Sequence, residues 1–154
     1  MASTDTCCTL VPYFKVQDGK LAEFKTLCEV FVEKTRTEPK CVHYAFSFDG
    51  DVAHCREGYD DADGLLAHLG NVGPTLQEAL KIAQLTKLEV HGPAAELDKL
   101  RGPLKDLNPQ WFTLECGFRA IRDTRTPLAV AVVVTAVKTG MNYLLIFGPF
   151  GVPK

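Results

Sequence analysis

Histidine is concentrated in one short stretch of this chain. Of the four histidines in its 154 residues, His43, His54 and His68 lie between Pro39 and Asn71. Imidazole titrates near neutral pH, so it can act as a general base or a general acid. If the chain is an enzyme, we expect its chemistry to be proton transfer carried out in this stretch.

The first part of the stretch has the pattern of a β-hairpin. Apolar residues occupy every second position, as in a strand with one buried face: Val42, Tyr44, Phe46 and Phe48. Asp49-Gly50 follows, a dipeptide that favours a two-residue turn. With these two residues as the loop, Tyr44 would pair with Cys55, and His43 with Arg56.

This hairpin would separate its side chains onto two faces. One face would carry Val42, Tyr44, Phe46, Ala53, Cys55, Glu57 and Tyr59, and the other Cys41, His43, Ser47, Val52, His54 and Arg56. On the second face we expect His43 and His54 to be diagonal neighbours beside the Arg56 guanidinium. Two histidines without a nearby carboxylate make a poor metal site, so we expect an anion pocket or a dimer-interface network there. A one-residue slip in register would change this grouping.

A helix is expected after the hairpin. Asp61 can cap it, and His68 lies on or beside its apolar stripe, formed by Leu65, Leu69 and Val72. Gly70 and Gly73-Pro74 are expected to interrupt this helix, and Pro74 suits the first turn of a new helix over Thr75–Leu85.

The remaining segments complete an alternation of strands and helices. We expect helices over Lys20–Thr35 and around the leucines from Leu97 to Leu107, and strands over Thr9–Val16, Thr86–His91 and Gln110–Phe118. Pro12 suggests that the first strand is an edge strand or ends there. The order β-α-β-β-α-β-α-β begins with the split βαβ pattern of a ferredoxin-like α+β fold. We therefore predict an antiparallel sheet with helices on one face, in a domain that covers residues 9–118.

The composition is that of an ordinary soluble domain. A net charge of −2 gives no reason to expect nucleic acid as a partner. The six cysteines lack zinc-type spacing, and we expect thiols in a reducing compartment rather than disulfides. The N-terminus has no signal-peptide pattern, so the expected location is the cytoplasm.

Residues 119–154 do not continue the domain's pattern. Two mostly apolar runs, Pro127–Val137 and Met141–Val152, flank Lys138. Three interpretations are open: an extra β-hairpin, which is slightly favoured, a segment that docks to or is anchored in a membrane, and an extension without a folded role. Lys138 near mid-span and uninterrupted runs shorter than the roughly 18 residues of a spanning helix disfavour the anchor.

Several short motifs resemble the antibiotic-biosynthesis monooxygenase family. They follow one another in the order Glu38-Pro39-x-Cys41, Tyr44, Glu57-x-Tyr59-x-Asp61 and His68, and the resemblance covers about residues 9–118. It implies a dimeric α+β barrel, in which the sheets of a homodimer close into a barrel. The segment from Arg119 onward has no counterpart in that family.

The resemblance also implies a reaction. Several family members oxygenate quinols or polycyclic phenols with dioxygen and without metal or flavin: a proton is removed from the substrate, and the resulting anion passes an electron to dioxygen. We therefore expect a cofactor-independent monooxygenase acting on a small aromatic or quinol-like molecule. Haem degradation is not expected, because the second helix has no tryptophan. The alternative is a non-catalytic ligand-binding or accessory subunit that uses the tail for docking.

Five residues are the catalytic candidates. His68 matches the family's helix histidine and would be the general base, and Asn71, one turn onward, could hold a substrate or oxygen-derived anion. Glu57 must be paired if it is buried, and Tyr44 or Tyr59 could bind a phenolic oxygen. Each also has an ordinary structural interpretation: a core-edge histidine, a helix-ending asparagine or a packing tyrosine.

Overall fold

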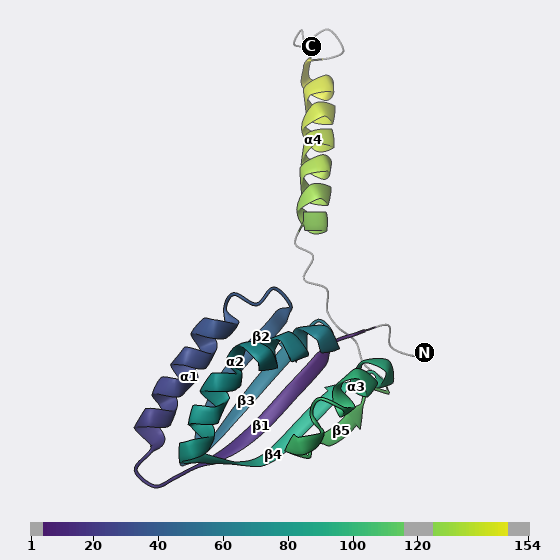
Figure 1. Cartoon of the computed structure of the whole chain (residues 1–154). Coiled ribbons are helices and arrows are strands. Elements are labelled where there is room, and N and C mark those ends of the chain that lie inside the picture. Colours follow the sequence, from purple (N-terminus) through teal and green to yellow (C-terminus); the bar gives the residue numbers. More distant parts are fainter. Residues whose placement is uncertain (1–4, 116–124, 148–154) are drawn as a thin grey trace. The chain divides into compact units, whose positions relative to one another are not determined.

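The computed structural model describes residues 5–115 and 125–147 and divides into two compact units, Met1–Phe118 and Arg119–Lys154. In the first unit the strands are β1 (Cys8–Val16), β2 (Cys41–Asp49), β3 (Val52–Tyr59), β4 (Ala83–Gly92) and β5 (Gln110–Thr113). Its helices are α1 (Leu21–Thr35), α2 (Ala62–Ile82) and α3 (Ala94–Arg101), followed by a 3₁₀ turn over Lys105–Leu107 (Figure 1). The second unit contains α4 (Arg125–Phe147).

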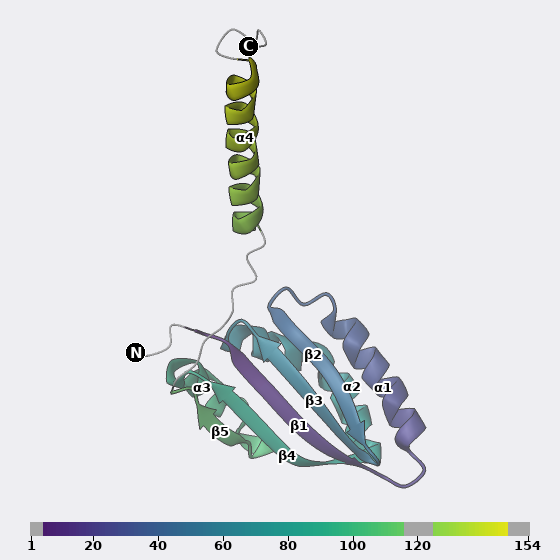
Figure 2. The ribbon, with the colours of Figure 1, turned by 180° about the vertical axis from the view of Figure 1, so that it is seen from behind.

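The sheet confirms the predicted α+β ferredoxin-like fold. Its strand order is β2-β3-β1-β4-β5, and the first four strands have the arrangement that a split βαβ unit produces. They pair antiparallel, whereas β5 joins the edge of β4 in parallel, so the sheet is mixed rather than wholly antiparallel. Helices α1 and α2 lie on one face of the sheet, and Figures 1 and 2 show the other face free of the described helices of this unit.

Pro12 does not mark an edge strand. It lies in β1, which is the central strand and pairs with β3 on one side and β4 on the other. The β1–β4 register shifts between Tyr13 and Phe14, next to the proline, which has no N–H to donate to a ladder. A local irregularity therefore accommodates the proline inside the sheet.

The hairpin exists, but its register differs from the predicted one by two residues. Asp49 pairs with Val52 and Tyr44 with Glu57, so the loop consists of Gly50 and Asp51. Gly50 has φ +57°, a left-handed conformation that glycine adopts without steric cost. Because side chains alternate with a period of two, a shift of two residues keeps the side chains from His43 onward on their predicted faces. A further register shift between Cys41 and His43 pairs Cys41 with Tyr59, so Cys41 lies on the core face and not on the predicted one.

The second helix is continuous, contrary to the predicted break at Gly70 and Gly73-Pro74. Helix α2 runs from Ala62 to Ile82 with Pro74 inside it. Its buried face continues on both sides of the proline, through Leu65, His68, Val72, Thr75, Ala79 and Ile82. Packing of this stripe on the sheet therefore outweighs the loss of one backbone hydrogen bond at Pro74.

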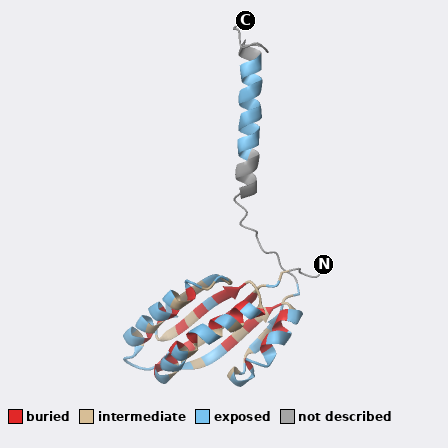
Figure 3. Cartoon of the chain, turned by 45° about the horizontal axis from the view of Figure 1, so that its top comes forward, coloured by how far each residue is buried: buried red, intermediate tan, exposed pale blue. Residues whose placement is uncertain are grey.

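The core lies between the sheet and its helices, as the buried residues of Figure 3 show. It consists of two clusters of buried apolar side chains. One is built around Leu10, Tyr59, Leu65 and Leu97, and the other around Phe14, Phe24, Phe31 and Val72. The site described below lies where these clusters adjoin.

The tail is helical, so the favoured β-hairpin is wrong. Helix α4 covers the first apolar run and the second as far as Phe147, and it includes Lys138 and Gly140. Alanine, leucine and methionine in the segment favour a helix, and it contains no two-residue turn signal of the Asn-Gly type. In the described part of the chain we find no helix of the length and apolarity that crossing a membrane requires.

Candidate active site

Glu57 and His68 face each other beneath the helices. The alternation of β3 directs Cys55, Glu57 and Tyr59 toward the helices, and the apolar stripe of α2 directs His68 toward the sheet. The side chain of Glu57 is 5% exposed and that of His68 is 2% exposed. Two ionisable groups are thus enclosed in a largely apolar interior, where each needs a partner.

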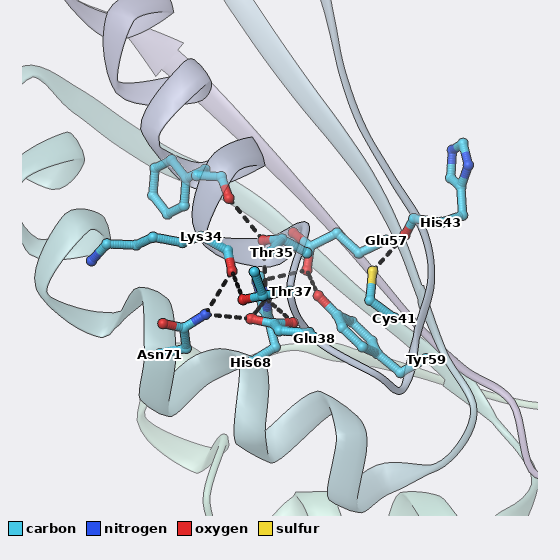
Figure 4. A network of polar contacts seen from close by, with 11 residues as sticks. Lys34, Thr35, Thr37, Glu38, Cys41, His43, Glu57, Tyr59, His68 and Asn71 are labelled. Atoms are coloured by element: carbon cyan, nitrogen blue, oxygen red, sulfur yellow. Dashed lines mark hydrogen bonds and ion pairs between the residues drawn. The ribbon is translucent and has the colours of Figure 1, made fainter.

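Each nitrogen of the His68 ring faces a carboxyl group (Figure 4). Nδ1 lies 3.0 Å from Oε2 of Glu38, and Nε2 lies 3.5 Å from Oε2 of Glu57. The Tyr59 hydroxyl donates a 2.8 Å hydrogen bond to the same Glu57 oxygen. Glu38, His68, Glu57 and Tyr59 therefore form one connected polar network.

Two further residues hold the Glu38 end of this network. Asn71 donates from Nδ2 to Glu38 Oε1 at 2.7 Å and to the Lys34 carbonyl at 3.1 Å. The Thr35 hydroxyl lies 3.5 Å from His68 Nδ1 and donates to the Phe31 carbonyl. The end of α1 is thereby tied to α2 by side chains that also orient the histidine and its carboxylate.

Burial shifts the pKa values of the network in opposite directions. Desolvation raises the pKa of Glu57 to about 7, although hydrogen bonds from Tyr59 and Cys55 oppose the shift. Desolvation lowers the pKa of His68 below its ordinary value, and the nearby Glu38 carboxylate opposes this. Burial also raises the pKa values of Tyr44, Cys55 and Tyr59, so these groups stay protonated at neutral pH.

The geometry fits one protonation pattern. A neutral His68 with its proton on Nδ1 can donate to a carboxyl oxygen of Glu38, and its Nε2 lone pair then faces Glu57. A protonated Glu57 can then donate toward Nε2. The pair presents one base and one acid side by side, and Glu38 stabilises the imidazolium that forms when His68 accepts a proton.

The pair opens into a narrow apolar cavity of about 40 Å³. Its polar lining residues are Tyr44, Glu57 and His68, and its apolar lining includes Leu10, Phe14, Phe31, Phe46, Val72 and Leu88. A second, more open cleft of about 300 Å³ lies on the other side of Tyr44, lined by Thr35, Glu38, Cys41 and Tyr44 among others. Tyr44 and the Glu38–His68 pair separate the two spaces.

The five catalytic candidates thus occupy different places. Tyr44, Glu57 and His68 line the cavity. Tyr59 is fully buried behind Glu57, and its hydroxyl is bound to that carboxyl. Asn71 is directed to Glu38 and the Lys34 carbonyl rather than to the cavity.

The two histidines of the second predicted cluster do not meet. The observed register places His43 opposite Gly58 and His54 opposite Ser47, so the two histidines are not diagonal neighbours. His54 lies against the Tyr13 ring and its Nδ1 is 3.2 Å from the Ser47 hydroxyl. The pKa of His54 is lowered mainly by desolvation and in addition by the nearby Arg56 guanidinium. Among the described side chains, no group of three or more potential ligands could hold a metal ion.

Glu38 is the functional candidate that sequence reasoning did not include among the site residues. It belongs to the Glu38-Pro39 motif, but it lies at the end of a helix and 30 positions before His68. An acidic residue next to a helix-ending proline is usually solvated. Only the packing of α1 against α2 brings it to the histidine.

The fold defines the class of this protein. A protein from Nitrosomonas europaea, provisionally named an antibiotic biosynthesis monooxygenase, is similar at 14% identity with a TM-score of 0.55 over 61% of this chain and 96% of that one. A Bacteroides thetaiotaomicron protein of unknown function, described as a possible oxidoreductase, matches at 17% identity and a TM-score of 0.52 over 56% and 97%. The chain therefore has the fold of the antibiotic-biosynthesis monooxygenase domains.

A more similar structure shows the family. MupZ from Pseudomonas fluorescens is 48% identical, with a TM-score of 0.75 over 78% of this chain and 94% of MupZ. The chain belongs to the family of MupZ, within the antibiotic-biosynthesis-monooxygenase-like fold. No family model and no curated protein matches the sequence.

Proposed function

We propose that this chain is an enzyme in which His68 and Glu57 transfer protons to and from a small, mostly apolar molecule. The observation that carries the proposal is the pair itself: a base and a neutral acid line one apolar cavity, and a carboxylate orients the base. A histidine that is buried only for structural reasons needs a hydrogen-bond partner, and a backbone carbonyl would supply one more simply. The position of His68 between two carboxyl groups therefore supports a catalyst over a ligand-binding or accessory subunit.

The proposed reaction is the oxygenation of an aromatic or quinol-like substrate by dioxygen without a metal or organic cofactor. His68 Nε2 accepts the proton of the substrate, and Glu38 stabilises the imidazolium. The substrate anion passes one electron to dioxygen, and the resulting radical and superoxide combine to a peroxide. The imidazolium returns its proton to the peroxide, which becomes a hydroperoxide. His68 Nε2 then takes the remaining hydrogen of that carbon as a proton while the O–O bond breaks and Glu57 protonates the leaving oxygen, so one oxygen atom leaves as water and the other stays in the product as a carbonyl oxygen. Transfer of the Nε2 proton to Glu57 restores the pair.

The cavity sets a condition on this reaction. About 40 Å³ is little more than the roughly 30 Å³ that one water occupies in the liquid. An aromatic substrate must therefore displace lining side chains, which are mainly leucine, phenylalanine and valine. Tyr44, at the boundary with the outer cleft, is the side chain whose displacement would join the two spaces.

Oxygen uptake with a panel of quinols and anthrones tests the reaction. We expect uptake by the wild type with at least one compound, and a fall in kcat of about 100-fold or more in His68→Ala and Glu57→Gln, since general acid–base groups contribute on that order. His91→Ala is the matched control, because His91 is partly exposed and lines neither the cavity nor the outer cleft. Equal rates in wild type and His68→Ala would remove His68 from the mechanism.

The protonated Glu57 favours a second candidate, a redox-neutral reaction such as an isomerisation or a dehydration. Oxygenation begins with a base, whereas these reactions need an acid and a base at once, and the site contains both. Substrate conversion that proceeds at the same rate under nitrogen and air would favour this candidate over the oxygenase.

We propose that the binding partner of this chain is a second copy of itself. The helix-free face of the sheet carries Val11 and Tyr13 together with charged residues, and a dimeric barrel would cover it. Light scattering tests this: a dimer mass supports the proposal, and a monomer mass at high micromolar concentration contradicts it.

A further inference from the structure

The His68 network reaches from the outer cleft to the inner cavity. Glu38 lines the cleft and its side chain is 13% exposed, whereas Glu57 lines the cavity and is 5% exposed. His68, at 2% exposure, lies between them and faces one carboxyl group with each ring nitrogen. Figure 4 shows the three side chains converging from three different segments of the fold.

We infer that Glu38 and His68 form a proton relay that exchanges protons between the outer cleft and the buried Glu57. The inference rests on the proposed function, because the proton that the relay exchanges with solvent is the one that Glu57 donates in the proposed reaction. It assigns a further role to Glu38, which neither the fold nor the acid–base pair specifies: Glu38 exchanges protons with the solvent in the outer cleft.

The relay can be written with every proton accounted for. Toward the outside, the Glu57 O–H bond breaks as an N–H bond forms at His68 Nε2, while the Nδ1–H bond breaks and the proton moves to Glu38. Glu38 then releases that proton to water in the cleft. Toward the inside, the same bonds break and form in reverse order. No oxidant or other reactant is needed. The imidazole is neutral before and after, but outward transfer leaves its proton on Nε2 instead of Nδ1, and inward transfer starts from that Nε2–H form and restores Nδ1–H.

The other titratable groups around the pair cannot replace this path. On β3, Cys55 and Tyr59 contact Glu57, and on β2, Tyr44 packs against the His68 ring with 5.2 Å between ring centroids. The pKa values of all three are raised by burial, so none of them ionises near pH 7. On the α1 side, the neighbours are the Thr35 hydroxyl and Glu38.

Asn71 is the positioning residue of the relay. Its amide donates to Oε1 of Glu38 at 2.7 Å, which holds the carboxylate with Oε2 3.0 Å from His68 Nδ1.

The first test needs no substrate. Two-dimensional ¹H–¹⁵N NMR of the histidine rings in the full chain distinguishes the Nδ1–H from the Nε2–H tautomer, and His68→Asn identifies the signals of His68. We expect the Nδ1–H tautomer in the wild type at pH 7.5, and a mixture in Asn71→Ala, whose exposed side chain can be removed without a core cavity. A wild-type Nε2–H tautomer would overturn the relay, because Nε2 could not then accept a proton from Glu57.

The second test uses turnover of whichever compound the uptake panel or the anaerobic assay identifies. We expect Glu38→Ala to lower the steady-state rate at least 10-fold and added formate to restore part of it, since formate can occupy the vacated carboxylate position. Glu33→Ala is the matched control, because Glu33 is an exposed glutamate of α1 paired with Arg36. An unchanged rate, or a loss that formate does not restore, would overturn the relay.

The two tests separate this inference from the proposed function. If the panel shows no oxygen uptake but the tautomer is Nδ1–H, the oxygenase reaction fails while the relay geometry stands. If uptake is present and depends on His68 but not on Glu38, the relay fails and the acid–base pair stands.

Discussion

At the scale of single residues, the buried carboxyl of Glu57 is the most informative group. An ionised carboxylate in an apolar interior is strongly disfavoured, so the group either finds a cation or takes up a proton. Here its neighbours are a neutral imidazole, a phenol and a thiol. None of these carries a positive charge, and the pKa of Glu57 is accordingly raised to about 7.

This raised pKa predicts a dependence of stability on pH. A carboxyl group whose folded pKa is about 7 and whose unfolded pKa is ordinary stabilises the fold fully below about pH 4.3, and this contribution is lost as the pH rises through 7. We expect the free energy of unfolding of the wild type, relative to Glu57→Gln, to fall by on the order of 3 kcal/mol between pH 5 and pH 8. Urea unfolding at the two pH values measures it.

Wild type must be compared with Glu57→Gln because the titration of His68 changes the stability of the fold in the direction opposite to that of Glu57. Its lowered pKa makes stability rise with pH up to its ordinary titration range. Parallel stability curves for wild type and Glu57→Gln would show that Glu57 is ionised in the folded protein at neutral pH, which would remove it as a general acid.

At the scale of secondary-structure elements, helix α2 shows how packing overrides local preference. Two glycines and a proline predicted a break, yet the helix is continuous because its buried residues lie on one stripe along its whole length. This continuity also affects the site. His68 lies before Pro74, so the second half of α2 anchors the helix that carries His68.

We expect Pro74→Ala to stabilise the protein. Pro74 is exposed, so little packing is lost, and alanine restores the N–H that can bond to the Gly70 carbonyl. A proline in a helix interior costs about 3 kcal/mol relative to alanine, and the free energy of unfolding in urea should rise by about 1–3 kcal/mol. Gly70→Ala is the matched comparison, because a Cβ there meets nothing within 4 Å and should add about 1 kcal/mol. Destabilisation by Pro74→Ala would mean that the proline shapes the helix as the domain requires.

At the scale of the whole molecule, the chain consists of two units that are built differently. All buried core residues of both clusters belong to the first unit. In the second unit, the described side chains of α4 from residue 131 to residue 144 are exposed, and many of them are valine, leucine or methionine. Among the described residues, Cys8, Cys28, Cys41 and Cys55 carry free thiols, and a reducing location stays a prediction.

Deletion of residues 119–154 should therefore leave the domain folded. We expect the truncated chain to remain soluble, with the oligomeric state of the full chain and a Tm within about 2 °C of it, since a change of 1 kcal/mol shifts the Tm of such a domain by only a few degrees. Differential scanning calorimetry and light scattering measure both. Aggregation, or a change from dimer to monomer, would show that the tail is part of the domain's own structure.

Much of the fold and of the site could be predicted from local patterns. The alternation along β2 and β3 identifies Tyr44, Glu57 and Tyr59 as neighbours on one buried face, and the spacing of α2 places His68 toward the same interior. These predictions hold because strand and helix periods are properties of the backbone. The predicted faces of the hairpin from His43 onward are correct although the loop is Gly50-Asp51 rather than Asp49-Gly50. A register shift of two residues preserves the alternation of the side chains.

The sequence alone therefore determined the order of the elements, the faces of the hairpin and the interior position of the histidine. Only the tertiary structure decided that α2 is continuous, that His43 and His54 are apart, and that Glu38 and Asn71 meet His68. The reason is physical: Glu38 lies 30 positions from His68 and 33 from Asn71, and no local period relates such positions. Their contact exists because α1 and α2 pack side by side on one sheet, and that packing is set by the whole core.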